Sequence, residues 1–219
     1  MTATAAVESE ARRVPRPRAD ALRNRERIVA AAREMFVEYG PEAPLDEIAR
    51  RAGIGNATLY RHFPDRNSLI HDVVLSVLAR TADLAEEVAM RESDPSIALR
   101  RFVHTAADER VGALCPLLVA GFDRVPSELD AARARLEGAL EALMERARQA
   151  GRLRTDVAVG DLMVALSQLT RPLPGTACVN MDRFTHRHLQ LFLDGLEAPA
   201  RSELPGKAAT LEDLRRAAP

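Results

Sequence analysis

Apolar residues recur three or four positions apart through most of the chain, and this spacing predicts amphipathic helices rather than strands. In the first such stretch, Ile28, Ala31, Met35 and Phe36 fall on one helical face. Later stretches repeat the pattern, with polar residues on the other faces. The expected helices cover residues 19–39, 45–52, 56–63, 66–90, 95–111, 126–151, 159–171 and 181–196.

Residues at the ends of these stretches support the boundaries. Asp20 and Asp65 are candidate N-caps, because a short acceptor side chain can bind the free amides of a first helical turn. Asp94-Pro95 begins a later helix, and Gly40-Pro41 ends the first one. Gly53-Ile54-Gly55 forms a tight turn between the two shortest helices.

Composition agrees with an all-α fold. The chain lacks tryptophan, has only 4% aromatic residues, and carries arginine at every basic position except Lys207. We expect three short N-terminal helices followed by a larger helical domain. The expected division is a flexible basic arm over 1–18, the three-helix domain over 19–65, the larger domain over 66–197 and a mobile tail over 198–219.

Residues 45–63 have the proportions of a helix-turn-helix. If Leu59 and Phe63 face the core, the 100° helical step turns the other side chains outward or onto the flanks. An exposed helix of this kind fits the major groove of DNA. The alternative is a surface helix inside an ordinary helical bundle.

The outward side chains carry the groups that DNA recognition needs. Asn56 can pair bidentately with adenine, and Arg61 can reach O6 and N7 of guanine. Four further residues can donate to phosphate oxygens: Thr58, Tyr60, His62 and Arg66.

Basic charge is concentrated in this N-terminal quarter. The whole chain has a net charge of −1, but residues 11–71 carry twelve arginines against eight acidic residues. Residues 1–18 include four of these arginines together with Pro15 and Pro17, so this arm is either a solvated tail or a segment that reaches DNA phosphates or a minor groove.

The residues around the turn resemble the TetR family of transcriptional regulators over about 27–75: Leu45-Asp-Glu-Ile-Ala-Arg-Arg-Ala-Gly-Ile54-Gly-Asn-Ala-Thr-Leu-Tyr60-Arg-His-Phe63-Pro-Asp-Arg66. The resemblance implies an all-helical homodimer whose N-terminal helices bind a palindromic operator in double-stranded DNA. It implies that 66–197 dimerises and encloses a pocket for a small-molecule effector, which remains unidentified. By position it implies base contacts at Asn56, Ala57 and Arg61, and phosphate contacts at Thr58, Tyr60, His62 and Arg66.

Two residues depart from the family pattern. Pro44 stands where a hydroxyl residue is common at the start of the second helix, so one phosphate contact is expected to be missing. Gly55 stands where serine or a charged residue is common, which leaves the third helix without a side-chain cap.

The last two apolar helices are the expected dimer seam, because their apolar residues cover more than one face. The alternative is a thicker core within one chain. The interface candidates are Leu162, Leu166, Leu169, Phe184, Leu189, Phe192 and Leu196, with Val164, Ala165, Leu191 and Leu193 beside them.

The effector-pocket candidates combine apolar bulk with a few polar atoms, as ligand pockets do. Each of them could instead be ordinary core. They are Phe102, His104, Thr105, Cys115, Leu118, Phe122, Met144, Met163 and Gln168. The long helix after Asp65 is expected to connect this pocket to the DNA-binding end.

Other function classes lack support in the sequence. We find no phosphate-binding glycine loop, nucleophile motif or metal-ligand pattern, so we expect neither an enzyme nor a bound cofactor. His186 and His188 are two residues apart and point in different directions on a helix, which argues against a metal site. Cys115 and Cys178 could sense oxidation, although a buried structural thiol is the commoner case.

The cellular setting follows from similar absences. The longest apolar run, 111–122, is too short to cross a membrane, and we expect a cytoplasmic protein with no membrane partner. We expect a ligand-responsive repressor. The alternatives are a DNA-binding regulator that answers to a protein partner instead of a small effector, and a small all-α carrier or enzyme.

Overall fold

The computed structural model describes residues 17–114, 126–170 and 182–215, and these residues are mainly helical. The extended pairing in these ranges is limited to one isolated antiparallel bridge between Leu153 and Glu197. The helices are α1 (Pro17–Tyr39), α2 (Leu45–Ala52), α3 (Asn56–His62), α4 (Arg66–Arg91), α5 (Pro95–Asp108), α7 (Pro126–Gln149), α8 (Val159–Leu169), α9 (Asp182–Gly195) and α10 (Leu211–Arg215). The all-α expectation is confirmed.

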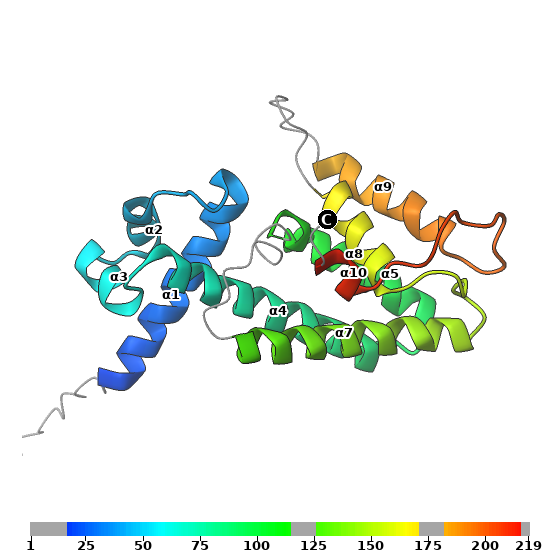
Figure 1. Cartoon of the computed structure of the whole chain (residues 1–219), viewed down its shortest axis with the longest axis horizontal. Coiled ribbons are helices and arrows are strands. Elements are labelled where there is room, and N and C mark those ends of the chain that lie inside the picture. Colours follow the sequence, from blue (N-terminus) through cyan, green and yellow to red (C-terminus); the bar gives the residue numbers. More distant parts are fainter. Residues whose placement is uncertain (1–16, 115–125, 171–181, 216–219) are drawn as a thin grey trace, which may run out of the picture.

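The helices form two groups joined by α4. The short α2 and α3 lie with α1 at one end of the molecule, and α5 and α7 to α10 form the other end (Figure 1). Helix α4 begins beside α3 and runs into the larger group, where it packs along α7 and α5. A movement of α4 therefore reaches both groups.

Helix α4 begins and packs as its sequence predicts. The side chain of Asp65 accepts from the backbone amide of Ser68 at 2.7 Å, and the Ser68 hydroxyl donates to the Asp65 carbonyl, so the predicted N-cap is confirmed. Its apolar residues at three- and four-residue intervals, from Leu69 to Val88, are buried. This burial fixes which face of α4 meets both groups.

Helix α1 begins differently from the prediction. It starts at Pro17, a residue type suited to a first helical turn, so Asp20 lies inside that turn and pairs with Arg23 instead of capping the helix. Asp94 does cap α5, because its carboxylate accepts from the amides of Ser96 and Ile97 at 2.8 and 3.2 Å.

The C-terminal segment makes more contacts than a mobile tail would. The amide of Ala209 donates to Asp161 at 3.1 Å, and α10 packs on α8. A Cβ added at Gly160 would lie 2.2 Å from the Ala209 carbonyl oxygen, so glycine permits this close approach. At least residues 209–214 are therefore bound to the larger group.

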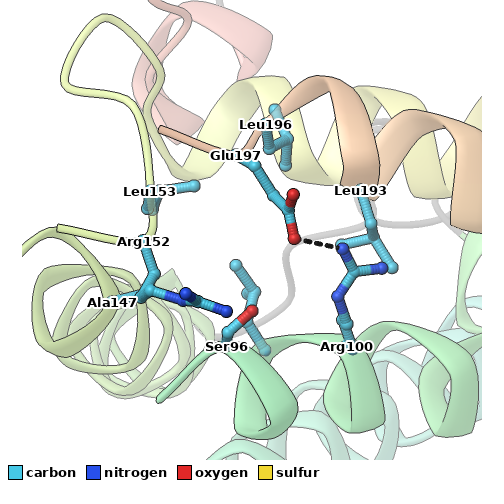
Figure 2. Close-up of a pocket in the computed structure, with 9 residues that line it drawn as sticks. Ser96, Arg100, Ala147, Arg152, Leu153, Leu193, Leu196 and Glu197 are labelled. Atoms are coloured by element: carbon cyan, nitrogen blue, oxygen red, sulfur yellow. Dashed lines mark hydrogen bonds and ion pairs between the residues drawn. The ribbon is translucent and has the colours of Figure 1, made fainter. Parts of the chain in front are cut away.

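Helices α5, α7 and α9 meet in a nearly solid junction. Arg100 of α5 pairs with Asp194 and Glu197 at 2.8 and 2.7 Å, and Leu153 and Leu193 line the same junction. Figure 2 shows the contact between Arg100 and Glu197. The cavity left there has a volume of about 10 Å³, room for about one water molecule. This junction fixes α9 on the bundle without providing space for an effector.

Candidate nucleic-acid interface

A tight turn sets the angle between α2 and α3. Gly53 ends α2 in the left-handed region at φ 65° and ψ 40°, and its amide donates to the Arg50 carbonyl at 3.1 Å. Arg27 of α1 donates to the Gly53 carbonyl at 3.3 Å, and a Cβ at Gly53 would lie 2.6 Å from that guanidinium. Glycine is therefore favoured here by the left-handed backbone conformation, and a larger residue would also displace the Arg27 guanidinium from its contact with the Gly53 carbonyl.

The faces of α3 agree with the helical-wheel prediction. Leu59 and Phe63 are buried, while Asn56, Ala57 and Arg61 are exposed and Tyr60 keeps 53% of its surface. Thus the three predicted base-contacting residues share the solvent side of the helix. Among residues 17–114, 126–170 and 182–215, none covers the face of α3 that a major groove would meet.

The start of α3 lacks a side-chain cap, as the glycine predicts. Gly55 is the N-cap residue, and only its carbonyl contributes, by accepting from the amides of Thr58 and Leu59 at 2.9 and 3.2 Å. Helix α2 begins at the N-cap residue Pro44, likewise without a side-chain cap. The free amides of both first turns therefore remain available to an acceptor outside the helix.

The four predicted phosphate contacts separate into two pairs. Tyr60 is exposed and Thr58 half-buried, so both hydroxyl-bearing side chains lie near the surface of α3. His62 and Arg66 are half-buried and are turned toward the chain itself.

His62 is in a setting that disfavours its charged form. Its Nε2 atom is buried and has no hydrogen-bond partner among the described residues. Burial, followed by the positive charges of Arg61 and Arg25, lowers the pKa of the imidazole below 6.5. A neutral His62 could still donate a hydrogen bond to phosphate, as the sequence suggested, but without a full positive charge.

Arg66 is occupied by the chain. Its Nη1 donates to the carbonyls of Pro41 and Ala43, both at 2.7 Å, and its Nε lies 4.0 Å from Glu42. The guanidinium thus holds the turn between α1 and α2 against the start of α4. The sequence predicts a phosphate contact for Arg66, whereas in the structure without DNA its guanidinium binds backbone carbonyls of its own chain.

Most of the other charges near this face are paired. Arg51 of α2 binds Glu38 of α1 through two bonds of 2.8 and 3.1 Å, and this contact lowers the pKa of Glu38. Arg50 pairs with Glu47 within α2. The exposed Arg61 therefore stands out as a cation directed at solvent from α3 itself.

Similarity to known proteins agrees with this geometry. The family model described as "Bacterial regulatory proteins, tetR family" matches residues 28–73, and the model described as "Transcriptional regulator SbtR-like, C-terminal domain" matches residues 94–198. The solved TetR transcriptional regulator SCO0520 from Streptomyces coelicolor is 32% identical, with a TM-score of 0.61, over 80% of this chain and 99% of that one. The chain belongs to the TetR family of transcriptional regulators.

Two further relatives support the assignment. A TetR transcription regulatory protein from Mycobacterium vanbaalenii is 30% identical, with a TM-score of 0.59, over 82% of this chain and 98% of that one. An HTH-type transcriptional regulator of Staphylococcus aureus, SAB2452, is 45% identical over 58 residues, which span 26% of this chain and 31% of that protein. This TetR-family protein is a DNA-binding transcriptional regulator and not an enzyme.

In this TetR-family chain most of the residues predicted for the dimer interface are buried or half-buried within one chain. Leu162, Leu166, Leu189 and Leu196 are buried within one chain, whereas Leu169 and Phe192 are half-buried. Of the seven candidates, Phe184 alone is exposed. The more exposed apolar residues of α8 and α9 are Val164, Phe184 and Leu191, at 40%, 41% and 59%.

The predicted effector residues also differ in accessibility. Phe102, Met144 and Met163 are buried, His104 and Thr105 are half-buried, and Gln168 is exposed. Cys115, Leu118 and Phe122, like Cys178, lie outside the described residues.

In the larger helical group, a pair of histidines connects α5 to α9. The Nδ1 atoms of His104 and His186 are 2.9 Å apart, and Nε2 of His186 lies 2.9 Å from Asp108. The sequence placed His186 and His188 in different directions, and in the structure His188 contacts the carbonyl of Phe184 at 2.8 Å. The described residues include no cluster of three or more groups suited to a metal, and none of their helices is long and apolar enough to cross a membrane.

Proposed function

We propose that this TetR-family regulator is a repressor that binds a palindromic operator as a homodimer and leaves it when a small molecule binds the larger helical group. The observation that carries the proposal is the outward face of α3, where Asn56, Ala57 and Arg61 are exposed together above the buried Leu59 and Phe63. A helix anchored by its inner face and free on its outer face suits insertion into a major groove.

Within this proposal the residues of α3 divide into two roles. The amide of Asn56 and the guanidinium of Arg61 contact base edges, and Ala57 leaves room for a close approach to a base. Thr58 and Tyr60 donate hydroxyl protons to phosphate, which positions the helix without reading sequence. His62 and Arg66 are weaker phosphate candidates, because burial and internal hydrogen bonds engage them.

The dimer would use the exposed apolar side of α8 and α9. Val164, Phe184 and Leu191 supply this surface, and it is distinct from the buried leucines that hold the two helices to their own chain. A two-fold axis through it would present two copies of α3 to half-sites about 34 Å apart or a multiple of this distance.

An effector would act by shifting a population. A ligand that binds one arrangement of the larger group more tightly moves the equilibrium by that difference in affinity. A cavity of about 180 Å³ lies between α5, the end of α8 and α9, and one of its lining residues, His186, contacts His104. Its lining residues are Ala107, Asp108, Arg110, Thr170, Thr185 and His186. Because α4 packs on α5, a ligand there could change the tilt of α4 and thereby the spacing of the two α3 helices.

The test is a gel shift with the DNA that flanks the regulator's own gene, repeated with a panel of metabolites. We expect a shifted complex whose footprint has two-fold symmetry, and at least one metabolite that releases it. Asn56→Ala should change the preference at one base pair per half-site by about 1–3 kcal/mol, whereas Tyr60→Phe should weaken all sequences equally. An asymmetric footprint would contradict the dimeric operator model.

The second candidate is a regulator released by a protein partner. This candidate would be favoured if no metabolite in the panel releases the regulator from the DNA while a cell extract does. In either case we place the protein in the cytoplasm, where its DNA lies.

A further inference from the structure

Arg25 of α1 contacts the recognition helix and the connecting helix at once. Its Nη1 donates to the backbone carbonyl of His62 at 3.2 Å, and its Nη2 lies 2.6 Å from Oδ2 of Asp72 on α4. Its guanidinium carbon is 4.5 Å from the centre of the Phe63 ring. One side chain therefore joins α1, the C-terminal end of α3 and the first turns of α4.

Helix α3 needs an anchor from outside itself. It has seven residues, too few for a stable helix in isolation, and its N-cap Gly55 offers no side-chain bond. The last carbonyls of a helix have no hydrogen-bond donor within the helix. Arg25 supplies a donor to one of these carbonyls, that of His62. Phe63 buries its ring in the core and receives the Arg25 guanidinium as well, so the whole C-terminal end of α3 depends on α1.

The ion pair with Asp72 extends this anchor to α4. The Asp72 side chain is 19% exposed, in the first third of α4 between the buried residues His71 and Val73. It therefore moves with the backbone of α4. An ion pair partly shielded from solvent also loses less of its strength to salt than an exposed one does.

We propose that Arg25 is the positioning residue that fixes the orientation of the recognition helix α3 relative to the connecting helix α4. It holds the His62 carbonyl, the Phe63 ring and the Asp72 carboxylate simultaneously, and a tilt of α4 reaches α3 through this three-way contact. The planar fork of arginine suits the task, since it stacks on a ring while donating in two fixed directions. The ammonium of lysine is a compact charge on a flexible stem, without a planar face to stack or a rigid donor geometry. The proposal rests on the DNA-binding role of α3 but not on any effector.

The main alternative is a direct contact between Arg25 and DNA phosphate. The Arg25 side chain keeps 42% of its surface exposed, so this alternative deserves its own measurement. A phosphate ligand and a positioning residue differ in how they alter the salt dependence of binding, because only a phosphate ligand releases counterions from DNA.

Hydrogen–deuterium exchange on the full-length protein without DNA tests the positioning role first. In Arg25→Ala we expect the amides of residues 58–63 to exchange about tenfold faster or more, as loss of a charged hydrogen bond predicts. Exchange in α2 should remain as in the wild type. Asp72→Asn, which keeps the shape of the side chain, should give a smaller acceleration at the same amides. Arg25→Lys should restore only part of the protection.

The matched control is Arg23→Ala, which removes an exposed arginine that pairs with Asp20 on the same helix. It should leave exchange in α3 unchanged. If Arg25→Ala accelerates α2 and α3 equally, or if Arg25→Lys behaves as the wild type, the three-way contact is not what orients α3. If Arg25→Ala does not fold, the Asp72→Asn result decides alone, and unchanged exchange in 58–63 overturns the proposal.

Binding to a mixed-sequence duplex then separates the two roles. We expect Arg25→Ala to keep the salt slope of the wild type on this duplex while losing about tenfold or more of its affinity for the DNA flanking its own gene. A salt slope lower by about one would make Arg25 a phosphate ligand and overturn the proposal. If neither the wild type nor Arg25→Ala binds the DNA that flanks the gene, the operator is not located there, whereas the exchange result on α3 still stands.

Discussion

Within the described part of the chain, two groups of exposed side chains at opposite ends of the molecule differ in their chemistry. The outer face of α3 presents an amide, a phenol and a guanidinium from Asn56, Tyr60 and Arg61. The outer side of α8 and α9 presents Val164, Phe184 and Leu191. The first surface suits hydrated phosphates and base edges; the second suits the apolar surface of another protein chain. One regulator therefore divides recognition of DNA and proposed self-association between its two ends, and each can be altered separately.

The largest expected effect comes from a charge on the apolar surface. Leu191→Glu should convert the proposed dimer to monomers in light scattering, because a carboxylate would be buried without a partner at the seam. The two copies of α3 would then no longer bind as a linked pair, so operator affinity should fall by about 10²–10⁴-fold. Met90→Glu is the control, since Met90 is another exposed apolar residue, on α4, away from α8 and α9. A dimeric Leu191→Glu protein would show that the seam lies elsewhere.

A substitution beneath the same surface should act on folding instead. Leu189 of α9 is fully buried in one chain, so Leu189→Ala should lower the free energy of unfolding by about 2–5 kcal/mol. Chemical denaturation at two protein concentrations measures this loss. The loss of unfolding free energy should be equal at both protein concentrations once the stabilisation by dimerisation is subtracted. If Leu189→Ala dissociates the dimer without destabilising the chain, Leu189 is an interface residue, as the sequence first indicated.

These two leucines show where sequence analysis reaches its limit. Helices α8 and α9 are apolar on more than one side, so periodicity predicted the helices but did not determine which side faces the core. By contrast, α3 offers Leu59 and Phe63 as an apolar pair, and the assumption that this pair faces the core agrees with its burial in the structure. The cap at Asp65 was also predictable, because capping involves residues only three apart.

Contacts between distant residues were not predictable in the same way. Arg66 binds carbonyls 23 and 25 residues earlier in the chain, and Arg25 binds one 37 residues later. In the sequence both residues are simply members of a basic segment. No spacing rule distinguishes an arginine that binds backbone carbonyls of its own chain from an arginine that is exposed to solvent, as Arg61 is. The two kinds became distinguishable only once the helices were packed.

Arg66 offers a direct test of this distinction. Since its guanidinium holds the carbonyls of Pro41 and Ala43, Arg66→Ala should lower the free energy of unfolding by about 1–3 kcal/mol. The salt slope of binding to a mixed-sequence duplex should not change. Arg61→Ala is the matched comparison, with little effect on stability and a weaker DNA complex. A salt slope reduced by about one in Arg66→Ala would restore the phosphate contact that the sequence predicted.

The smallest expected effect concerns the pH dependence of the DNA-binding end. Burial and two neighbouring arginines lower the pKa of His62 from its ordinary 6.5, so the unfolded chain takes up the proton more readily than the folded one. The contribution of His62 to stability is therefore complete above about pH 6.5 and is lost as the pH falls through its folded-state pKa. His62→Gln should remove this part of the pH dependence, which urea unfolding at about pH 5 and about pH 8 measures as a smaller difference than in the wild type. The other histidines are unchanged in this variant and serve as the internal reference, so equal differences in the two proteins would mean that His62 titrates alike in the folded and unfolded chains.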